Sequence, residues 1–220
     1  RGVTEGDISP QSMLWAAIGT LGVAALLGLS LIYWGGWWLV AAGVLIVLGA
    51  LAYSTGPYPL SRHGWGEVAV VFFFGIAPVT LTYYVQTGNC TADVWLAAVA
   101  MGLLGANVLI VNNYRDMEDD RAVGKLTIAV RFGRRFAGRL YLVNGIAAWC
   151  MLTVIWMRLS WVGSGISALQ LLSSITLWRQ LLTLEGRTLT ALLARTALLM
   201  LLLSLAMILL AAAKQVVISN

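Results

Sequence analysis

Residues 92–111 read ADVWLAAVAMGLLGANVLIV, and residues 112–121 follow directly as NNYRDMEDDR. About twenty predominantly apolar residues are what an α-helix needs to cross the hydrocarbon core of a bilayer. Charged groups beside such a span are costly to misplace, and a cluster of acidic ones is usually functional. The two segments together predict a membrane helix that ends in a polar site.

Composition extends this interpretation to the whole chain. Hydrophobic residues make up 60% of the 220 residues and charged residues only 10%, which is unlike a soluble domain. The apolar runs are continuous rather than alternating, so they favour helices over a β-barrel. We expect an all-α, polytopic transmembrane helical bundle that forms a single integral membrane domain over residues 1–220. About seven spans of membrane-crossing length are expected: Ser12–Trp34, Gly36–Tyr53, Glu67–Gln86, Ala92–Val111, Ala137–Met157, Trp161–Trp178 and Leu189–Ala213.

Basic residues are distributed unevenly between the two ends of these spans. One side carries Arg115, Arg121, Lys125, Arg131, Arg134, Arg135 and Arg139, together with Arg1, Arg62, Arg179 and Arg187. Only Arg158 and Lys214 fall on the other side. The positive-inside rule therefore places the acidic cluster in the cytoplasm, and we expect a bacterial inner-membrane protein. Topology and contact with anionic lipid explain the net charge of +5, and no nucleic-acid-binding module is present.

The charged stretch predicts a site for a divalent cation. If the helix continues through it, Asp116 and Asp120 lie one turn apart on one face, with Asn112 one turn earlier. Two carboxylates and an amide oxygen suit Mg²⁺, which prefers oxygen ligands and leaves room for phosphate oxygens. Basic residues bracket the group: Arg115, Arg121 and Lys125. This combination favours a diphosphate-handling site, and the alternative is an ordinary solvated helix end.

A second polar segment lies on the same side, at residues 53–67, YSTGPYPLSRHGWGE. It can cap a pocket, with Arg62 on a phosphate and Glu67 near the mouth of the next span. The alternative is a Pro/Gly turn that only connects two helices. His63 is the only histidine of the chain; it is a candidate base, but without an identifiable partner it is expected to be a solvated loop residue.

The order of these residues resembles the second Asp-rich motif of the UbiA superfamily of intramembrane prenyltransferases. The matching string is N-N-x-R-D-x-x-x-D-R-x-x-G-K-x-T-x-A-V-R-x-G, from Asn112 to Gly133. It is most similar to the branch that prenylates 1,4-dihydroxy-2-naphthoate. The Tyr53–Glu67 segment is similar to the Y-x-x-x-P-x-P-L…G-x-G-E loop of that branch, and Phe73-Phe74-Gly75 continues the match. The resemblance spans nearly the whole chain and is specific in the two polar segments.

One departure from the family pattern concerns the beginning of the chain. Members of the family have about nine helices and carry a first Asp-rich motif, N-D-x-x-D, on the second helix. Neither that motif nor two leading helices is found in this sequence. Since the Mg²⁺–diphosphate site of the family takes carboxylates from both motifs, we expect the isolated polypeptide to be inactive and the full-length parent to be the enzyme.

The resemblance implies a Mg²⁺-dependent transfer of a polyprenyl or phytyl group from its diphosphate to 1,4-dihydroxy-2-naphthoate, with decarboxylation. The implied partners are this donor, the aromatic acceptor and membrane lipid. The implied metal ligands are Asp116, Asp120 and Asn112, and the implied catalytic residues are Asp116, Asp120, Arg115 and Lys125. Substrate contacts are assigned to Asn112, Asn113, Arg121, Tyr53 and Arg62. No base that binds the aromatic ring can be named from the sequence.

Other functions remain compatible with the sequence. Within the superfamily, the acceptor can instead be 4-hydroxybenzoate, homogentisate, chlorophyllide or haem, although the N-N-x-R-D form favours naphthoate. Outside it, a membrane transporter can also carry paired carboxylates, but transport sites tend to lie near the bilayer midplane in broken helices. A purely structural subunit of a membrane complex is the third alternative.

Overall fold

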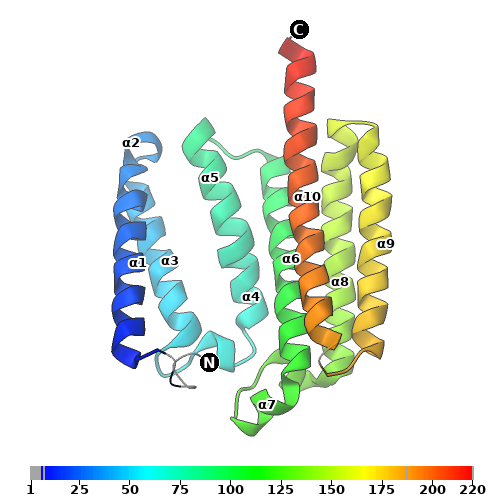
Figure 1. Cartoon of the computed structure of the whole chain (residues 1–220). Helices are drawn as coiled ribbons and strands as arrows, with labels where there is room; N and C mark the ends of the chain where they lie inside the picture. Colours follow the sequence, from blue (N-terminus) through cyan, green and yellow to red (C-terminus); the bar gives the residue numbers. More distant parts are fainter. Residues whose placement is uncertain (1–5, 7, 187, 220) are drawn as a thin grey trace.

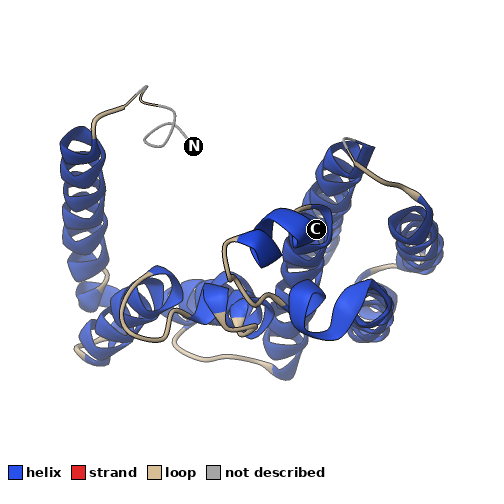
Figure 2. Cartoon of the chain, turned by 90° about the horizontal axis from the view of Figure 1, so that it is seen from below, coloured by secondary structure: helices blue, strands red, loops and turns tan. Residues whose placement is uncertain are grey.

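The computed structural model describes residue 6, residues 8–186 and residues 188–219. Arg1 and Arg187, which contributed to the predicted orientation, lie outside the described residues. The elements of the described part are all helices (Figures 1 and 2), which confirms the all-α prediction. They are α1 (Pro10–Ser30), α2 (Ile32–Gly35), α3 (Trp38–Ser54), the 3-10 helix η1 (Leu60–Arg62), α4 (Gly66–Val70), the π-helix η2 (Val71–Ile76), α5 (Ala77–Thr87), α6 (Ala92–Arg115), α7 (Met117–Ala122), α8 (Ile128–Leu159), α9 (Val162–Thr183) and α10 (Thr188–Ser219).

Each of the seven predicted spans lies largely on helical residues, but the number of spans is not confirmed. In the described part, five helical segments are both long and apolar enough to cross a membrane: Pro10–Gly35, Gly66–Thr87, Ala92–Arg115, Ile128–Leu159 and Thr188–Lys214. The helix α3 is apolar but has only 17 residues. The helix α9 has 22 residues, but it is interrupted by Ser, Thr, Gln and Arg side chains that make it less apolar.

The long helices run side by side, and α6 lies at the centre of their packing (Figure 1). It contacts α8, α10 and the continuous helical segment formed by α4, η2 and α5. Seen from below, the helices form an elongated group rather than a closed ring, with α1 at one edge (Figure 2). No residue of α1 or α3 is buried, as expected for apolar helices whose surroundings are lipid.

Charged side chains lie at both ends of the bundle. The helix α7 lies at the lower end in Figure 1, together with the start of α8. At the opposite end, Arg158 forms an ion pair with Asp93, and the Arg158 carbonyl accepts a hydrogen bond from Lys214 Nζ at 2.7 Å. The segment between the predicted spans Ala92–Val111 and Ala137–Met157 is mostly helical. It contains the end of α6, the short helix α7 and the first residues of α8, inside which only Gly133 departs from helical dihedrals.

A close crossing of glycines joins η2 to α6. A Cβ atom added to Gly75 would overlap the Cα atom of Gly102, and one added to Gly102 would lie 2.6 Å from the Val71 carbonyl oxygen. Small residues let membrane helices approach each other closely, which is their main route to tight packing in lipid. This crossing holds the middle of the α4–η2–α5 segment against α6, next to the end where the site described below is formed.

Gly75→Ala is expected to destabilise the protein, because the added methyl group meets α6 backbone that cannot move aside. Overpacking of this kind costs about 1–3 kcal/mol. The matched control is Gly22→Ala on α1, where no atom lies within 4 Å of the added Cβ and a helical Gly→Ala change gains up to about 1 kcal/mol. Thermal unfolding of the full-length protein in detergent measures both. Equal melting temperatures for the two variants would show that the crossing is loose.

Candidate functional site

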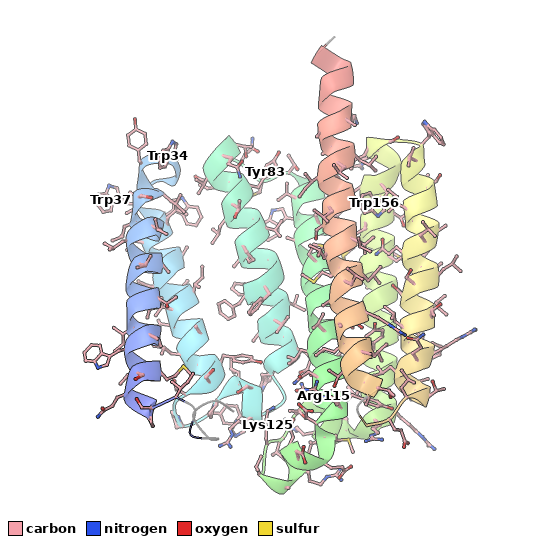
Figure 3. The ribbon with its side chains drawn as sticks, in the orientation of Figure 1. Trp34, Trp37, Tyr83, Arg115, Lys125 and Trp156 are labelled. Atoms are coloured by element: carbon pink, nitrogen blue, oxygen red, sulfur yellow. The ribbon has the colours of Figure 1, made fainter. Side chains whose placement is uncertain are left out.

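A pocket of about 200 Å³ lies where α4 and α6 meet. Its walls come from the end of α3, the loop that follows it, the start of α4, the end of α6 and the segment after α7. The residues that line it are Tyr53, Ser61, Gly64, Gly66, Glu67, Leu109, Asn112, Asn113, Lys125 and Thr127. Lys125 and Arg115 are found at the lower end of the bundle, opposite Trp34, Trp37 and Tyr83 (Figure 3). The pocket is smaller than the roughly 300–1,000 Å³ of sites for drug-sized ligands. It therefore suits the small polar end of a ligand rather than a long apolar chain.

Hydrogen bonds tie the two polar segments to each other across this pocket. The Leu126 amide donates to the Arg62 carbonyl at 2.8 Å, and Arg131 Nη1 donates to the His63 carbonyl at 2.9 Å. Gly64 adopts a φ of +78°, and a Cβ atom there would lie 3.3 Å from the Leu126 carbonyl oxygen. The positive φ therefore favours glycine at this turn, and the Leu126 carbonyl leaves little room for a Cβ atom.

His63 serves the loop rather than the pocket. Its Nδ1 lies 2.8 Å from the Pro59 carbonyl oxygen, and its ring stacks on Tyr58 with 3.7 Å between ring centroids. Both contacts are local and hold the turn in shape. His63 is thus a loop residue, as expected, but it is part-buried between two local partners and not solvated.

Glu67 forms an inner wall of the pocket. Only 4% of the residue is exposed, and Asn113 Nδ2 donates a hydrogen bond to its Oε1 atom at 2.9 Å. Its second oxygen, Oε2, is buried without a hydrogen-bond partner among the described residues. From the sequence, Glu67 is expected near the mouth of a span, but it is not among the predicted site residues. The sequence feature that could have identified Glu67 is its position as an acidic residue at the start of an otherwise uncharged apolar run.

Arg115 connects two of the predicted metal ligands. Its Nε and Nη2 atoms donate to the two carboxylate oxygens of Asp116 at 2.6 and 2.9 Å, and Nη2 also donates to Asn112 Oδ1 at 2.9 Å. Bidentate pairs of this type are among the stronger hydrogen-bonded contacts in proteins. In this structure, the guanidinium group therefore occupies one side of the predicted cation site.

Lys125 holds Asp120, the third predicted ligand, beside the pocket. Its Nζ atom lies 3.1 Å from both carboxylate oxygens of Asp120, which is 8% exposed. Arg121 instead pairs with Glu118 on an exposed surface. The side chain of Arg62 is absent from the pocket lining, and its structural contribution is the carbonyl bond to Leu126.

The structure thus brings together most of the predicted residues, but not all of them. Tyr53, Asn112, Asn113 and Lys125 line the pocket. Arg115, Asp116 and Asp120 lie next to it, because each pairs with a lining residue or with a neighbour of one. Arg62 and Arg121 do not line it.

The charged stretch does not form one continuous helix. The helix α6 ends at Arg115, and α7 begins at Met117 after a bend at Asp116, whose φ and ψ are −92° and 11°. The Asp120 amide still donates to the Asp116 carbonyl at 2.8 Å, so the spacing of one turn is kept. The bend allows Asp116 to reach Arg115, since adjacent side chains do not face each other on a regular helix.

The donor set fits a hard cation in its chemistry. Asp116, Asp120 and Asn112 offer oxygen atoms only, as Mg²⁺ prefers, and this ion keeps several waters and phosphate oxygens besides its protein ligands. Within the described part of the chain, no group of three or more His, Cys, Asp or Glu side chains is placed to hold a metal. These residues can therefore supply two carboxylates to the cation, and the phosphate oxygens of a bound substrate would complete its ligands.

Several known prenyltransferases are similar to this chain. The chain is 35% identical over 160 residues to the 1,4-dihydroxy-2-naphthoate octaprenyltransferase of Haemophilus influenzae, covering 69% of this chain and 52% of that protein. A protein of the same name from Mycobacterium tuberculosis is 39% identical over 133 residues, 60% of this chain and 46% of its own length. The 2-carboxy-1,4-naphthoquinone phytyltransferase of Synechocystis is 30% identical over 139 residues, 58% of this chain and 45% of that protein.

The chain spans about half the length of these curated relatives. No solved structure matches it. The UbiA prenyltransferase family matches residues 1–202, which include the pocket and both polar segments. The chain therefore belongs to the UbiA prenyltransferase family.

Proposed function

We propose that this chain forms part of a Mg²⁺-dependent prenyltransferase that moves a polyprenyl or phytyl group from its diphosphate to 1,4-dihydroxy-2-naphthoate, with loss of CO₂. The observation that carries the proposal is the pocket at the end of α6, where Lys125 and Asn112 join carboxylates to a cavity between membrane helices. The names of the relatives support both the donor and the acceptor class.

Each residue of the site has a part in this reaction. Asp116, Asp120 and Asn112 would hold Mg²⁺, which when bound supplies positive charge to the departing diphosphate. Lys125 and Arg115 add fixed positive charge at the same place, where negative charge develops as the C–O bond of the donor breaks. Asn113 positions Glu67, and the apolar residues of α6 exclude water from the reacting carbon.

Prenyl transfer breaks the C–O bond of the donor, forms a C–C bond to the acceptor and releases CO₂. The allylic C–O bond of the donor breaks, and both of its electrons leave with the diphosphate. The ring carbon that bears the carboxylate then forms a bond to the prenyl carbon. Loss of the carboxylate as CO₂ leaves its electron pair in the ring and restores aromaticity.

The location of the pocket supports a membrane enzyme with a cytoplasmic active site. Arg115 and Lys125 lie at the lower end of the bundle in Figure 3, and the positive-inside rule assigns the end with more basic residues to the cytoplasm. We propose the bacterial inner membrane as its location. A pocket at the end of the helices rather than at their middle also disfavours the transporter alternative.

The test uses membranes that contain the full-length protein. They are supplied with 1,4-dihydroxy-2-naphthoate, a prenyl diphosphate and Mg²⁺, and the lipid extract is examined by mass spectrometry. We expect a prenylated, decarboxylated naphthalene product that disappears when EDTA removes the metal.

Parallel reactions with 4-hydroxybenzoate and homogentisate test the acceptor. A product with one of these and none with naphthoate would keep the reaction class and overturn the proposed acceptor. If a folded sample gives no product with any of the three, the enzyme proposal fails.

A further inference from the structure

Only one of the two oxygens of the buried Glu67 carboxylate has a hydrogen-bond partner among the described residues. Asn113 fixes one oxygen at 2.9 Å, whereas Oε2 has no hydrogen-bond partner among the described residues, although only 4% of the residue is exposed. Burial of a charged oxygen without a partner destabilises the folded protein by several kcal/mol, unless a ligand pairs with that oxygen. Glu67 also lines the pocket, so its carboxylate lies next to any molecule that binds there.

The other polar groups of the lining indicate what kind of molecule fits. Besides Lys125, they are neutral hydroxyl and amide side chains: Tyr53, Ser61, Thr127, Asn112 and Asn113. The predicted metal ligands Asp116 and Asp120 do not line the pocket and pair with Arg115 and Lys125 instead. A carboxylate set among neutral polar groups and one lysine, in a small cavity, is suited to accept a hydrogen bond from a neutral hydroxyl.

We propose that Glu67 binds the ring hydroxyl next to the reacting carbon of the aromatic acceptor and takes its proton during prenyl transfer. This inference rests on the proposed function and deepens it, because it names the group that recognises the acceptor. The substrate class is an aromatic compound with a hydroxyl group ortho to the carbon that receives the prenyl group. Asn113 is a positioning residue, since it holds the Glu67 carboxylate in place.

The proton transfer completes the electron balance of the reaction. As the ring carbon forms its bond to the prenyl group, the hydroxyl proton moves to Glu67 Oε2 and the C–O bond becomes a carbonyl. The intermediate is a β-keto carboxylate, which loses CO₂ and leaves an enolate. The enolate oxygen takes the proton back from Glu67, so the aromatic hydroxyl and the carboxylate are both regenerated.

The decisive test measures binding and does not depend on turnover. The purified full-length protein is titrated with 1-hydroxy-2-naphthoate and, in parallel, with 1-methoxy-2-naphthoate. Glu67→Gln keeps an oxygen for Asn113 but places an amide, which is not an acceptor, where Oε2 was. We expect the variant to bind the hydroxyl compound about 10- to 100-fold more weakly than the wild type, the range for a hydrogen bond to a charged group.

The methoxy compound provides the internal control. It has no hydroxyl proton to donate, so wild type and Glu67→Gln are expected to bind it equally weakly. Glu67→Asp retains a carboxylate and is expected to recover part of the affinity for the hydroxyl compound. Equal binding of the hydroxyl compound to wild type and Glu67→Gln, or no binding to the wild type, would overturn the proposal.

Steady-state kinetics separate this proposal from the proposed function. In Glu67→Gln, we expect kcat to fall about 100-fold, as for loss of a general base, with the donor KM and the Mg²⁺ requirement unchanged. A changed Mg²⁺ requirement with unchanged acceptor binding would instead make Glu67 part of the metal site and refute the assignment. If the binding difference holds but the wild type prenylates none of the tested acceptors, the proposed reaction fails and the hydroxyl-binding role of Glu67 stands.

Discussion

Asp116→Asn and Asp120→Asn, made separately in the full-length protein, are each expected to lower kcat by about 100-fold or more. Asparagine has nearly the same shape but carries no charge, so each variant weakens the hold on Mg²⁺ and on the diphosphate that it neutralises. Prenyl transfer measured at increasing Mg²⁺ concentration checks this. Excess Mg²⁺ should recover part of the activity, because the remaining oxygen ligands still bind the ion weakly.

Asp119→Asn is the matched control for this pair of variants. Asp119 belongs to the same short helix α7, but its side chain is exposed and it does not line the pocket. The same change of charge one residue away should leave kcat within about twofold, as for most surface substitutions. A comparable loss in all three variants would mean that the net charge of the segment matters and not the two specific carboxylates.

Lys125→Met is expected to lower kcat/KM for the prenyl diphosphate by about 100-fold. Lys125 supplies the only positive charge among the residues that line the pocket in the described structure. Methionine keeps much of the length of the side chain but cannot neutralise the departing diphosphate. Initial rates over a range of donor concentrations, at saturating acceptor, measure the effect.

A double variant separates catalysis from structure at the Asp120–Lys125 pair. Loss of one partner leaves a mostly buried charge uncompensated, so each single variant should also melt at a lower temperature. Asp120→Asn combined with Lys125→Met removes both charges and should recover part of the melting temperature without recovering turnover. If turnover returns together with stability, the pair has only a structural role.

Two features of the bundle explain why the pocket forms at its lower end. The Gly75–Gly102 crossing draws the α4–η2–α5 segment against α6, so the first residues of α4 meet the last turns of α6. The backbone bond from Leu126 to the Arg62 carbonyl then brings the segment after α7 over the same place. These two contacts hold the segment before and at the start of α4 against the end of α6 and the segment after α7.

Much of this arrangement follows from local sequence. The apolar stretch from Ala92 to Val111 requires a helix, because lipid offers no partner for unpaired backbone groups. The turn spacing of Asp116 and Asp120 likewise survives the bend between α6 and α7. Hydropathy was less informative for α3 and α9, since length and polar side chains place them outside the segments that clearly span a membrane.

The sequence by itself determined the helical class, the approximate positions of the helices and the charged stretch that carries the candidate ligands. Only the tertiary structure placed Glu67 against Asn113, 46 residues away in the sequence, and turned Asp116 toward Arg115. The physical reason is that hydropathy and helical spacing report how each segment meets lipid and water. Which buried polar groups face each other depends on how the helices pack and where their backbones bend.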